Sequence, residues 1–168
     1  LSYDFIPATP SVAPTEQRNI VKTEACLACH TKLGVSTPHG GLSDVYLCVL
    51  CHTSQRANGR TNTASVNGAF TGSTYIADGE VVGEFVTMIH KIHMGEELYK
   101  TGYNFANVLF NEVVLPQSVQ NCRVCHVEDT ATAPQALNWK DKPSRKACGA
   151  CHDNINFATG ANSKAGGT

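Results

Sequence analysis

The clearest periodic pattern in the chain lies in residues 84–95, where apolar residues recur with helical spacing. A rotation of about 100° per residue places four of them in one stripe: Phe85, Met88, Ile89 and Ile92. Gly95 follows the last periodic residue, where a helix commonly ends. The pattern predicts a helix with His90 and His93 side by side along one flank of its apolar stripe.

Elsewhere the pattern is weak, and three segments are expected to be irregular. Residues 1–17 contain several prolines and are predicted to form an extended lead-in. Residues 54–80 are rich in Gly, Asn, Thr and Ser, which predicts a long flexible surface loop. Residues 158–168 are small and polar and are expected to be a loose tail. Together these features predict one domain over residues 1–168, mainly irregular, with a few α-helices and little β-structure.

Charge and length exclude several classes of protein. The net charge is -1, from 13 basic and 14 acidic residues, which argues against a general nucleic-acid binder. No apolar run approaches the ~18 residues that predict a transmembrane segment. The first ten residues lack the basic and apolar regions of a signal peptide, so we expect that a signal was removed or that the chain belongs to something larger.

The composition is unusual in its cysteines and histidines. The chain has 8 cysteines and 7 histidines, whereas only 7% of its residues are aromatic, including one Trp. A chain of this length with so few large apolar side chains can bury only a modest core. Something other than protein is therefore expected to fill part of the interior.

The cysteine spacing gives the strongest chemical signal. All eight cysteines fall in four copies of the pattern Cys-x-x-Cys-His: Cys26, Cys29 and His30; Cys48, Cys51 and His52; Cys122, Cys125 and His126; Cys148, Cys151 and His152. This pattern is the attachment signature of a c-type haem. Each thiol adds to one haem vinyl group, and the adjacent histidine ligates the iron. The sequence therefore predicts four covalent haem c groups with four proximal histidines.

Three other uses of paired cysteines compete with haem attachment. Four such pairs can form two Cys₄ zinc ribbons, thioredoxin-like redox pairs or the disulfide framework of a secreted chain. The thioredoxin motif belongs with a βαβ pattern, which this sequence lacks. None of the three requires a histidine directly after the second cysteine, whereas haem attachment does. The repeated histidine therefore favours haem.

Counting axial ligands leaves one position without a histidine. Beyond the four proximal residues, three histidines are candidates for distal ligands: His39, His90 and His93. The spacing of His90 and His93 lets each reach one of two neighbouring haems, and His39 lies in a short turn with two glycines. Four haems with two histidines each need eight, and the chain has 7.

Several groups can complete the remaining axial position. Met94 lies near His90 on the predicted helix and is the better of the two methionines. Met88 belongs to the apolar stripe, where a core position is the simpler interpretation. Lys164, water and a residue from outside this chain are the other candidates. A methionine ligand would raise the potential of that haem.

The residues resemble a known family. Residues 88–95 are close to the M-I-H-x-I-H-x-G helix of the outer-membrane multihaem cytochromes of the OmcA/MtrC type, and residues 38–41 resemble the H-G-G ligand turn of that family. The similarity continues in further segments: residues 3–7, 18–26, 115–122, 138–148 and 153–160. The resemblance covers nearly the whole chain and points to one haem-bearing module of these proteins.

The resemblance implies that His39, His90 and His93 are distal ligands. It also implies a chain of bis-histidine haems that transfers electrons to minerals, flavins or partner cytochromes outside the cell. Modules of the family usually carry a fifth Cys-x-x-Cys-His motif and a ligand histidine where residues 162–167 read Asn-Ser-Lys-Ala-Gly-Gly. Both are absent from this sequence, so we expect a trimmed domain or a small free-standing relative.

The predicted function is electron transfer through four closely packed, mostly bis-histidine haems. Other redox proteins or multihaem cytochromes are the expected partners, with mineral or flavin acceptors in addition. Two alternatives stay open: a self-assembling filament subunit, and a reductase that uses one haem with an open axial position. The sequence shows no acid–base set that would favour the enzyme. Because haems are attached to this motif outside the cytoplasm, we expect a periplasmic or cell-surface location, in association with the outer membrane.

Overall fold

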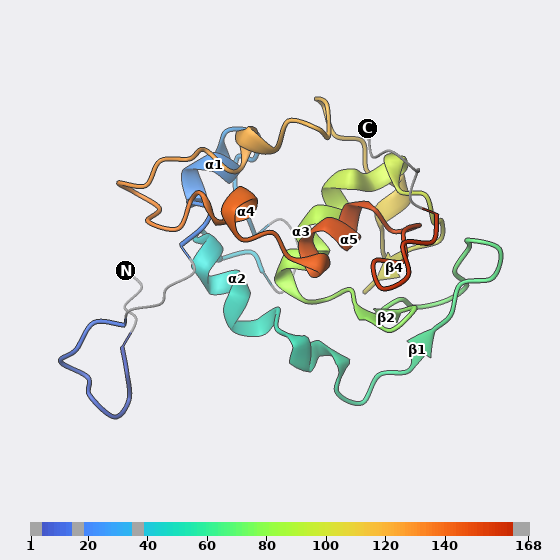
Figure 1. The fold of residues 1–168 in the computed structure, drawn as a ribbon, viewed down its shortest axis with the longest axis horizontal. Helices are drawn as coiled ribbons and strands as arrows, with labels where there is room; N and C mark the ends of the chain where they lie inside the picture. Colours follow the sequence, from blue (N-terminus) through green and yellow to red (C-terminus); the bar gives the residue numbers. More distant parts are fainter. Residues whose placement is uncertain (1–4, 15–18, 35–38, 163–168) are drawn as a thin grey trace. The chain divides into compact units, whose positions relative to one another are not determined.

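A computed structural model describes residues 5–14, 19–34 and 39–162. Short helices and strands alternate with long irregular segments (Figure 1). The α-helices are α1 (Thr23–Leu27), α2 (Val45–Cys51), α3 (Phe85–Met94), α4 (Asn138–Asp141) and α5 (Arg145–Cys151). The 3₁₀ helices are η1 (Ser54–Ala57), η2 (Gly95–Glu97), η3 (Phe110–Glu112) and η4 (Cys122–Val124). The strands are β1 (Asn62–Thr63), β2 (Ile76–Ala77), β3 (Glu80–Val81), β4 (Asn104–Phe105) and β5 (Val108–Leu109). The expected fold class, mainly irregular with few helices and little sheet, is confirmed.

Some predicted features fall partly outside the described residues. Residues 1–4 and 15–17 of the expected lead-in are among them, and so are residues 163–168 of the expected tail, including Lys164. The described residues divide into two compact units. The first unit combines residues 1–48 with residues 122–142, and the second combines residues 49–121 with residues 143–168.

In the first unit, polar contacts connect the starts of α1 and α2. The hydroxyl of Thr23 donates to Asp44 Oδ1 at 3.1 Å and accepts the backbone N–H of Val45 at 3.0 Å. Asp44 Oδ1 also accepts the N–H of Tyr46 at 2.9 Å, as a capping side chain does at the start of a helix. Two short helices that would be unstable alone are therefore anchored to each other.

The second unit contains a cluster of aromatic and aliphatic side chains. Its buried members are Phe70, Ala77, Val82, Leu98, Tyr103, Phe105 and Phe110. Partly buried side chains pack against them: Tyr75, Met88, Ile92 and Met94. The placement of Met88 against this core agrees with its interpretation as a core residue.

Two tight hairpins frame the cluster. In the first, β2 pairs with β3 in antiparallel register, and Asp78 and Gly79 at its tip have φ angles of 48° and 84°. In the second, β4 pairs with β5, and Ala106 and Asn107 have φ angles of 51° and 67°. Two consecutive positive φ angles match the twist of two-residue hairpins. β1 pairs with β2 in parallel, so residues 54–80, expected to form a loop, contain η1, β1 and β2.

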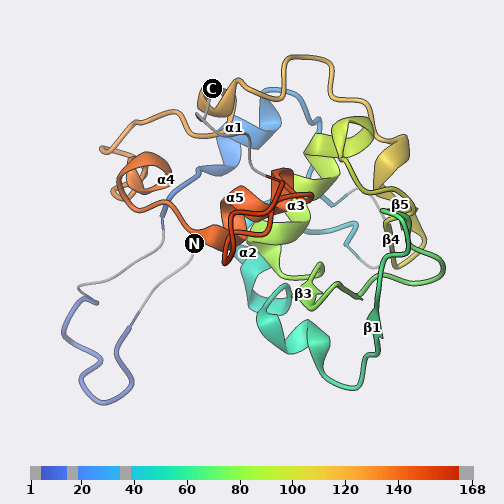
Figure 2. The same cartoon turned by 45° about the vertical axis from the view of Figure 1, so that its right-hand side comes forward.

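Helix α3 confirms the helix predicted from periodicity and lies beside α5 in both views (Figures 1 and 2). It ends at Gly95, whose φ of 52° favours glycine. A Cβ there would overlap the backbone carbonyl of Val113, so the chain can pass Val113 only with glycine at this position. Across the described ranges, no helix has both the length and the apolar character needed to cross a membrane.

Candidate functional site

Each Cys-x-x-Cys-His motif lies on a turn of helix. In the first, third and fourth motifs the backbone N–H of the histidine donates to the carbonyl of the first cysteine, at 2.9–3.0 Å. Residues at positions i, i+3 and i+4 share one face of a helix, so both thiols and the imidazole project from the same side. The second motif lies at the end of α2, which contains Cys48 and Cys51. A turn of helix that projects both thiols and the imidazole from one side fits two thioether bonds and a proximal histidine.

The helical turns are fixed by local capping contacts. Ser144 precedes α5, and its hydroxyl accepts the N–H of Ala147 at 3.1 Å. Asp44 has the same role before α2. Capping residues of this kind each stabilise a helix by about 1 kcal/mol. The motifs on α2 and α5 are therefore held in helical form by the chain itself.

The cysteines of the first three motifs lie close enough to interact electrostatically. Burial raises the pKa of the Cys26 thiol, and the thiols of Cys125 and Cys48 raise it further. Burial also raises the pKa of Cys125, with Cys29 and Cys122 adding to the effect. All five of these thiols belong to the first unit. The motifs that are far apart in the sequence are thus gathered in space.

The proximal candidate His52 is held from two sides by the segment that leads into α3. Its ring Nδ1 donates to the carbonyl of Gly83 at 2.9 Å, and its own carbonyl accepts the N–H of Phe85 at 2.9 Å. A Cβ on Gly83 would lie 2.5 Å from the ring of Phe105. Only glycine therefore brings this carbonyl into position.

The distal candidates His90 and His93 lie on α3, and both rings are oriented by backbone carbonyls one turn earlier. His90 Nδ1 donates to the carbonyl of Val86 at 2.7 Å, and His93 Nδ1 donates to that of Ile89 at 2.9 Å. Burial lowers the pKa of His90, with a contribution from His93, so its ring is neutral at neutral pH. The carbonyls are acceptors only, so they fix the proton on Nδ1 and leave the lone pair on Nε2.

His39, the third distal candidate, lies in a turn closed by two backbone bonds. Leu42 N–H donates to the carbonyl of His39 at 2.9 Å, and Gly34 N–H donates to the carbonyl of Leu42 at 3.1 Å. A Cβ on Gly34 would overlap the carbonyl of His39, so glycine permits the close approach. Pro38, the first residue of the predicted turn, lies outside the described residues.

The residues present fit a covalently bound haem. A ligand histidine almost always donates its second ring nitrogen to a carbonyl, carboxylate or water, as His52, His90 and His93 do here. Apolar side chains in the cysteine motifs stay exposed on the polypeptide, with Leu50 72% exposed and Leu27 42% exposed. A large flat apolar group beside the cysteines would cover them.

The surroundings of the third motif also fit such a group. Trp139 stacks on the ring of His126, with ring centroids 5.6 Å apart. Its buried Nε1–H has no hydrogen-bond partner among the described residues. A buried donor of this kind calls for an acceptor that the polypeptide does not supply. Haem carries such acceptors on its propionates.

The alternative uses of the cysteines find less support. No disulfide joins any of the eight cysteines, all of which lie within the described residues. In those parts of the chain, no group of three or more His, Cys, Asp or Glu side chains converges as a metal-ion site would. A Cys₄ zinc ribbon needs four converging thiolates. Within the described residues the cysteines do not form such a cluster.

Met94, the candidate for the eighth axial position, lines a pocket of about 210 Å³ in the second unit. Glu96, Glu97 and residues of the segment 115–120 complete its wall. The pocket therefore lies beside the end of α3. From the sequence, residues 115–122 were only part of the family resemblance and had no predicted place beside α3.

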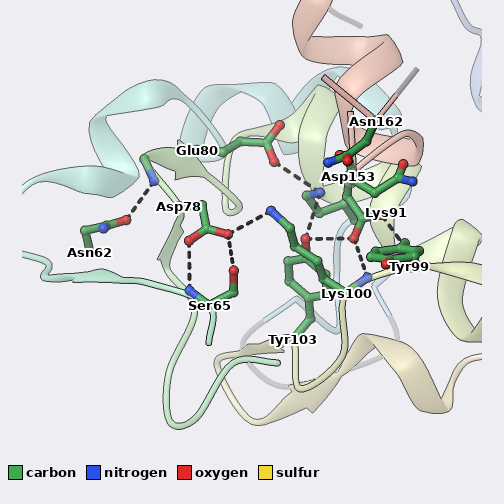
Figure 3. A network of polar contacts seen from close by, with 12 residues as sticks. Asn62, Ser65, Asp78, Glu80, Lys91, Tyr99, Lys100, Tyr103, Asp153 and Asn162 are labelled. Atoms are coloured by element: carbon green, nitrogen blue, oxygen red, sulfur yellow. Dashed lines mark hydrogen bonds and ion pairs between the residues drawn. The ribbon is translucent and has the colours of Figure 1, made fainter. Parts of the chain in front are cut away.

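A polar network around Lys91 of α3 is not predictable from the sequence patterns. It involves Glu80, Tyr103 and Asp153 (Figure 3). The only signal in the sequence is the position of Lys91 on the helix. It lies four residues from Thr87 and from Gly95, and all three are buried. Four-residue spacing marks one helix face.

Comparison with known proteins defines the class. Residues 18–168 match the family described as outer membrane cytochrome MtrC/MtrF-like, domains II/IV. The chain is similar to the multiheme cytochrome MtrC of Shewanella baltica (strain OS185), with 30% identity over 158 residues. That match covers 94% of this chain and 18% of the relative.

Two solved structures are also similar. The crystal structure of MtrC from Shewanella baltica OS185 matches with a TM-score of 0.54 and 28% identity, over 90% of this chain and 18% of that one. The outer membrane decaheme cytochrome OmcA matches with a TM-score of 0.63 and 26% identity, over 89% of this chain and 21% of that one. The chain thus spans about a fifth of the length of these relatives.

The class is therefore that of multihaem c-type cytochromes. The chain belongs to the MtrC/MtrF-like family of outer-membrane cytochromes, as a module of the kind found at domains II and IV. The family resemblance inferred from the motifs is confirmed, and the outer-membrane association of the family agrees with the location expected from the chemistry of haem attachment.

Proposed function

We propose that this chain is a tetrahaem electron-transfer module with mostly bis-histidine ligation. The observation that carries the proposal is the shared geometry of His52, His90 and His93, whose Nδ1 atoms all donate to backbone carbonyls at 2.7–2.9 Å. With the proton on Nδ1 engaged in this way, the Nε2 atom of each ring is the one left to bind iron. When bound, each haem would supply a one-electron ferric/ferrous couple.

The proposed roles divide the functional residues into three sets. The cysteines would form the thioether bonds: Cys26, Cys29, Cys48, Cys51, Cys122, Cys125, Cys148 and Cys151. The proximal ligands would be His30, His52, His126 and His152. The distal ligands would be His39, His90 and His93. Histidines on both sides of an iron would leave no open position for a substrate, so such a haem would transfer electrons only.

For the eighth axial position, Met94 is the candidate within the described residues, beside Lys164, water and a residue from outside this chain. Its support is its place at the end of α3, directly after His93 and at the wall of the pocket. A thioether ligand would raise the potential of its haem above those of the bis-histidine haems.

We propose that residues 1–168 act as one tetrahaem domain. The match of residues 18–168 to a single family description supports this. The electron partners would be other redox proteins or multihaem cytochromes, and minerals or flavins, at the cell surface or in the periplasm.

The proposal is tested on the holoprotein by counting haems and their ligands. A pyridine haemochrome assay should give about four haems per chain, as four attachment motifs require. Electron paramagnetic resonance of the oxidised protein should show low-spin ferric signals of bis-histidine type. Zero haems would contradict the proposal outright.

Matched variants sharpen the test. His90→Met and His93→Met should each change the ligands of one haem from two histidines to one histidine and one methionine. The reduction potential of that haem should rise, while the haem count stays constant. A high-spin haem that binds cyanide in the unmodified protein would instead favour the reductase alternative.

A further inference from the structure

A lysine is buried in the middle of the helix that carries the distal histidine candidates. Lys91 is the only charged side chain among the described residues that is classed as buried, with 0% of its surface exposed. A buried ammonium is expensive unless it is paired and fully hydrogen-bonded. Its presence therefore needs a reason beyond filling space.

Three groups from three segments surround the ammonium. Lys91 Nζ lies 3.1 Å from Glu80 Oε2 and donates to Tyr103 Oη at 3.3 Å (Figure 3). It also donates to the carbonyl of Ala150 at 3.2 Å. An ammonium has three N–H donors, so each has one partner here. Glu80 compensates the charge of the ammonium, and the two hydrogen bonds fix its direction.

The contact with Ala150 connects α3 with the fourth Cys-x-x-Cys-His motif. Ala150 lies between Cys148 and Cys151 on α5, and α5 packs against α3. The carbonyls in the last turn of a helix lack partners within the helix and attract positive charge. Lys91 therefore caps α5 at the fourth attachment motif while belonging to the helix of His90 and His93.

The network continues from Tyr103 to Asp153, the residue that follows the fourth motif. Tyr103 Oη donates to Asp153 Oδ2 at 3.1 Å, and Asp153 directly follows His152. The same carboxylate accepts the backbone N–H groups of Tyr99 and Lys100 at 3.0 Å each. The network thus holds the fourth motif on both sides, at Ala150 and at Asp153.

Lys91 acts from the back of α3. Successive residues of a helix are rotated by about 100°, so Lys91 projects away from the side shared by His90 and His93. Thr87 and Gly95 are buried on the same back face. An apolar side chain could fill this space, but it would not fix the height of α3 along α5 as the directional hydrogen bond to the Ala150 carbonyl does.

We propose that Lys91 is a positioning residue for distal ligation. It fixes α3 in register against α5, so that the rings of His90 and His93 stay at the height and angle that their haems require. The inference rests on the proposed function, since it takes His90 and His93 to be the distal ligands.

The first test is the variant Lys91→Met in the holoprotein, because methionine keeps the length of the side chain and removes its charge and donors. We expect loss of the low-spin bis-histidine signal by up to two haem equivalents, with a matching gain of high-spin or altered low-spin signal. Lys146→Met is the matched control. Lys146 Nζ pairs with Glu84 Oε2 at 2.5 Å and also joins α5 to the start of α3, but with 45% of its side chain exposed. This control should leave the spectrum unchanged.

A second variant separates positioning from stability. Lys91→Met alone leaves the carboxylate of Glu80 without its cation, which lowers stability for a trivial reason. In Glu80→Gln/Lys91→Met an uncharged amide replaces that carboxylate. The melting temperature should therefore recover, while the altered ligand signal remains. Recovery of both, or an unchanged spectrum in either variant, would overturn the inference. If the single variant does not accumulate as holoprotein, the double variant decides.

A measurement on the unmodified holoprotein completes the test. If Lys91 couples the two helices, the central amides of α3 and those of α5 should exchange hydrogen through one common opening event. Exchange of α3 at a distinctly lower opening free energy would overturn the inference. The proposed function fails separately, by the absence of bis-histidine signals in the unmodified protein.

Discussion

Glycines with no room for a side chain place several of the functional groups. Gly83 brings its carbonyl to the ring of His52, Gly34 lets the His39 turn close, and Gly95 ends α3 against Val113. In each case a Cβ would meet a backbone carbonyl or an aromatic ring. The ligand geometry therefore depends on residues that carry no chemistry themselves.

Gly83→Ala should destabilise the protein and disturb the second motif. The new Cβ would lie 2.5 Å from Phe105 Cε2 and 2.8 Å from Phe105 Cζ, which forces the ring or the backbone to move. Overpacking of this kind costs about 1–3 kcal/mol. We expect a fall of that size in the free energy of unfolding, measured by denaturant titration. A shift in one low-spin signal should accompany it, because the carbonyl that orients His52 moves with the backbone.

Gly149→Ala is the matched control for this prediction. Its Cβ would meet the ring of Phe157 at 3.5 Å, an ordinary van der Waals distance, inside helix α5. Alanine is the better helix former by up to about 1 kcal/mol. Stability should stay level or rise, and equal losses in the two variants would show that the packing against Phe105 is not the cause.

At the scale of elements, α3 carries two candidate ligands and contacts two of the four Cys-x-x-Cys-His motifs. Its first residue binds the backbone of His52, its middle carries His90 and His93, and its back packs on α5 through Lys91. The sequence predicted this helix and its end correctly, because periodicity and Gly95 are local signals. It did not predict the buried face, since the pairing of Lys91 with Glu80 exists only after the chain has folded.

The hairpin formed by β2 and β3 depends on a carboxylate at its tip. Asp78 accepts hydrogen bonds from Ser65 N–H at 2.8 Å, Ser65 Oγ at 2.7 Å and Lys100 Nζ at 2.8 Å. Burial alone would raise the pKa of Asp78, but the bonds from Lys100 and Ser65 outweigh it and lower the pKa below its usual 3.8. The ionised form is thus the one that the folded state stabilises.

Asp78→Asn should reduce stability at neutral pH but not in acid. A group with a lowered pKa in the folded state contributes above its unfolded pKa, and the contribution disappears as pH falls through the folded pKa. We expect a loss of about 1 kcal/mol in the free energy of unfolding at about pH 7. The two proteins should converge as the pH falls through the lowered pKa of folded Asp78. A difference of the same size at neutral and at acid pH would contradict the assignment.

At the scale of the whole molecule, the two units differ in what the polypeptide can bury. In the first unit the buried apolar residues are small or β-branched, namely Ala25, Val45, Ala133 and Ala136. The second unit has an aromatic cluster that includes Phe70, Tyr103, Phe105 and Phe110. The composition predicted a thin core, but it could not say that the aromatics gather in one unit, because that depends on long-range contacts.

This difference predicts how the chain behaves without its cofactors. Binding of a group that the unfolded chain cannot hold contributes directly to folding, so the apoprotein as a whole should be largely unfolded. Within it, residues 19–34 and 122–142 should exchange their amide hydrogens at nearly the rate of an open chain. Some protection should remain around Phe70, Phe105 and Phe110, where apolar area is buried without a haem.

The measurement compares hydrogen exchange in the holoprotein and in apoprotein made without haem attachment. Loss of the haems should reduce the protection of amide hydrogens much more in the first unit than in the aromatic cluster of the second unit. A variant with Cys26→Ala and Cys29→Ala, which removes one attachment site, should lose protection first in the first unit. Equal loss in both units would mean that the aromatic cluster also depends on the haems, and that the chain has a single core built on its cofactors.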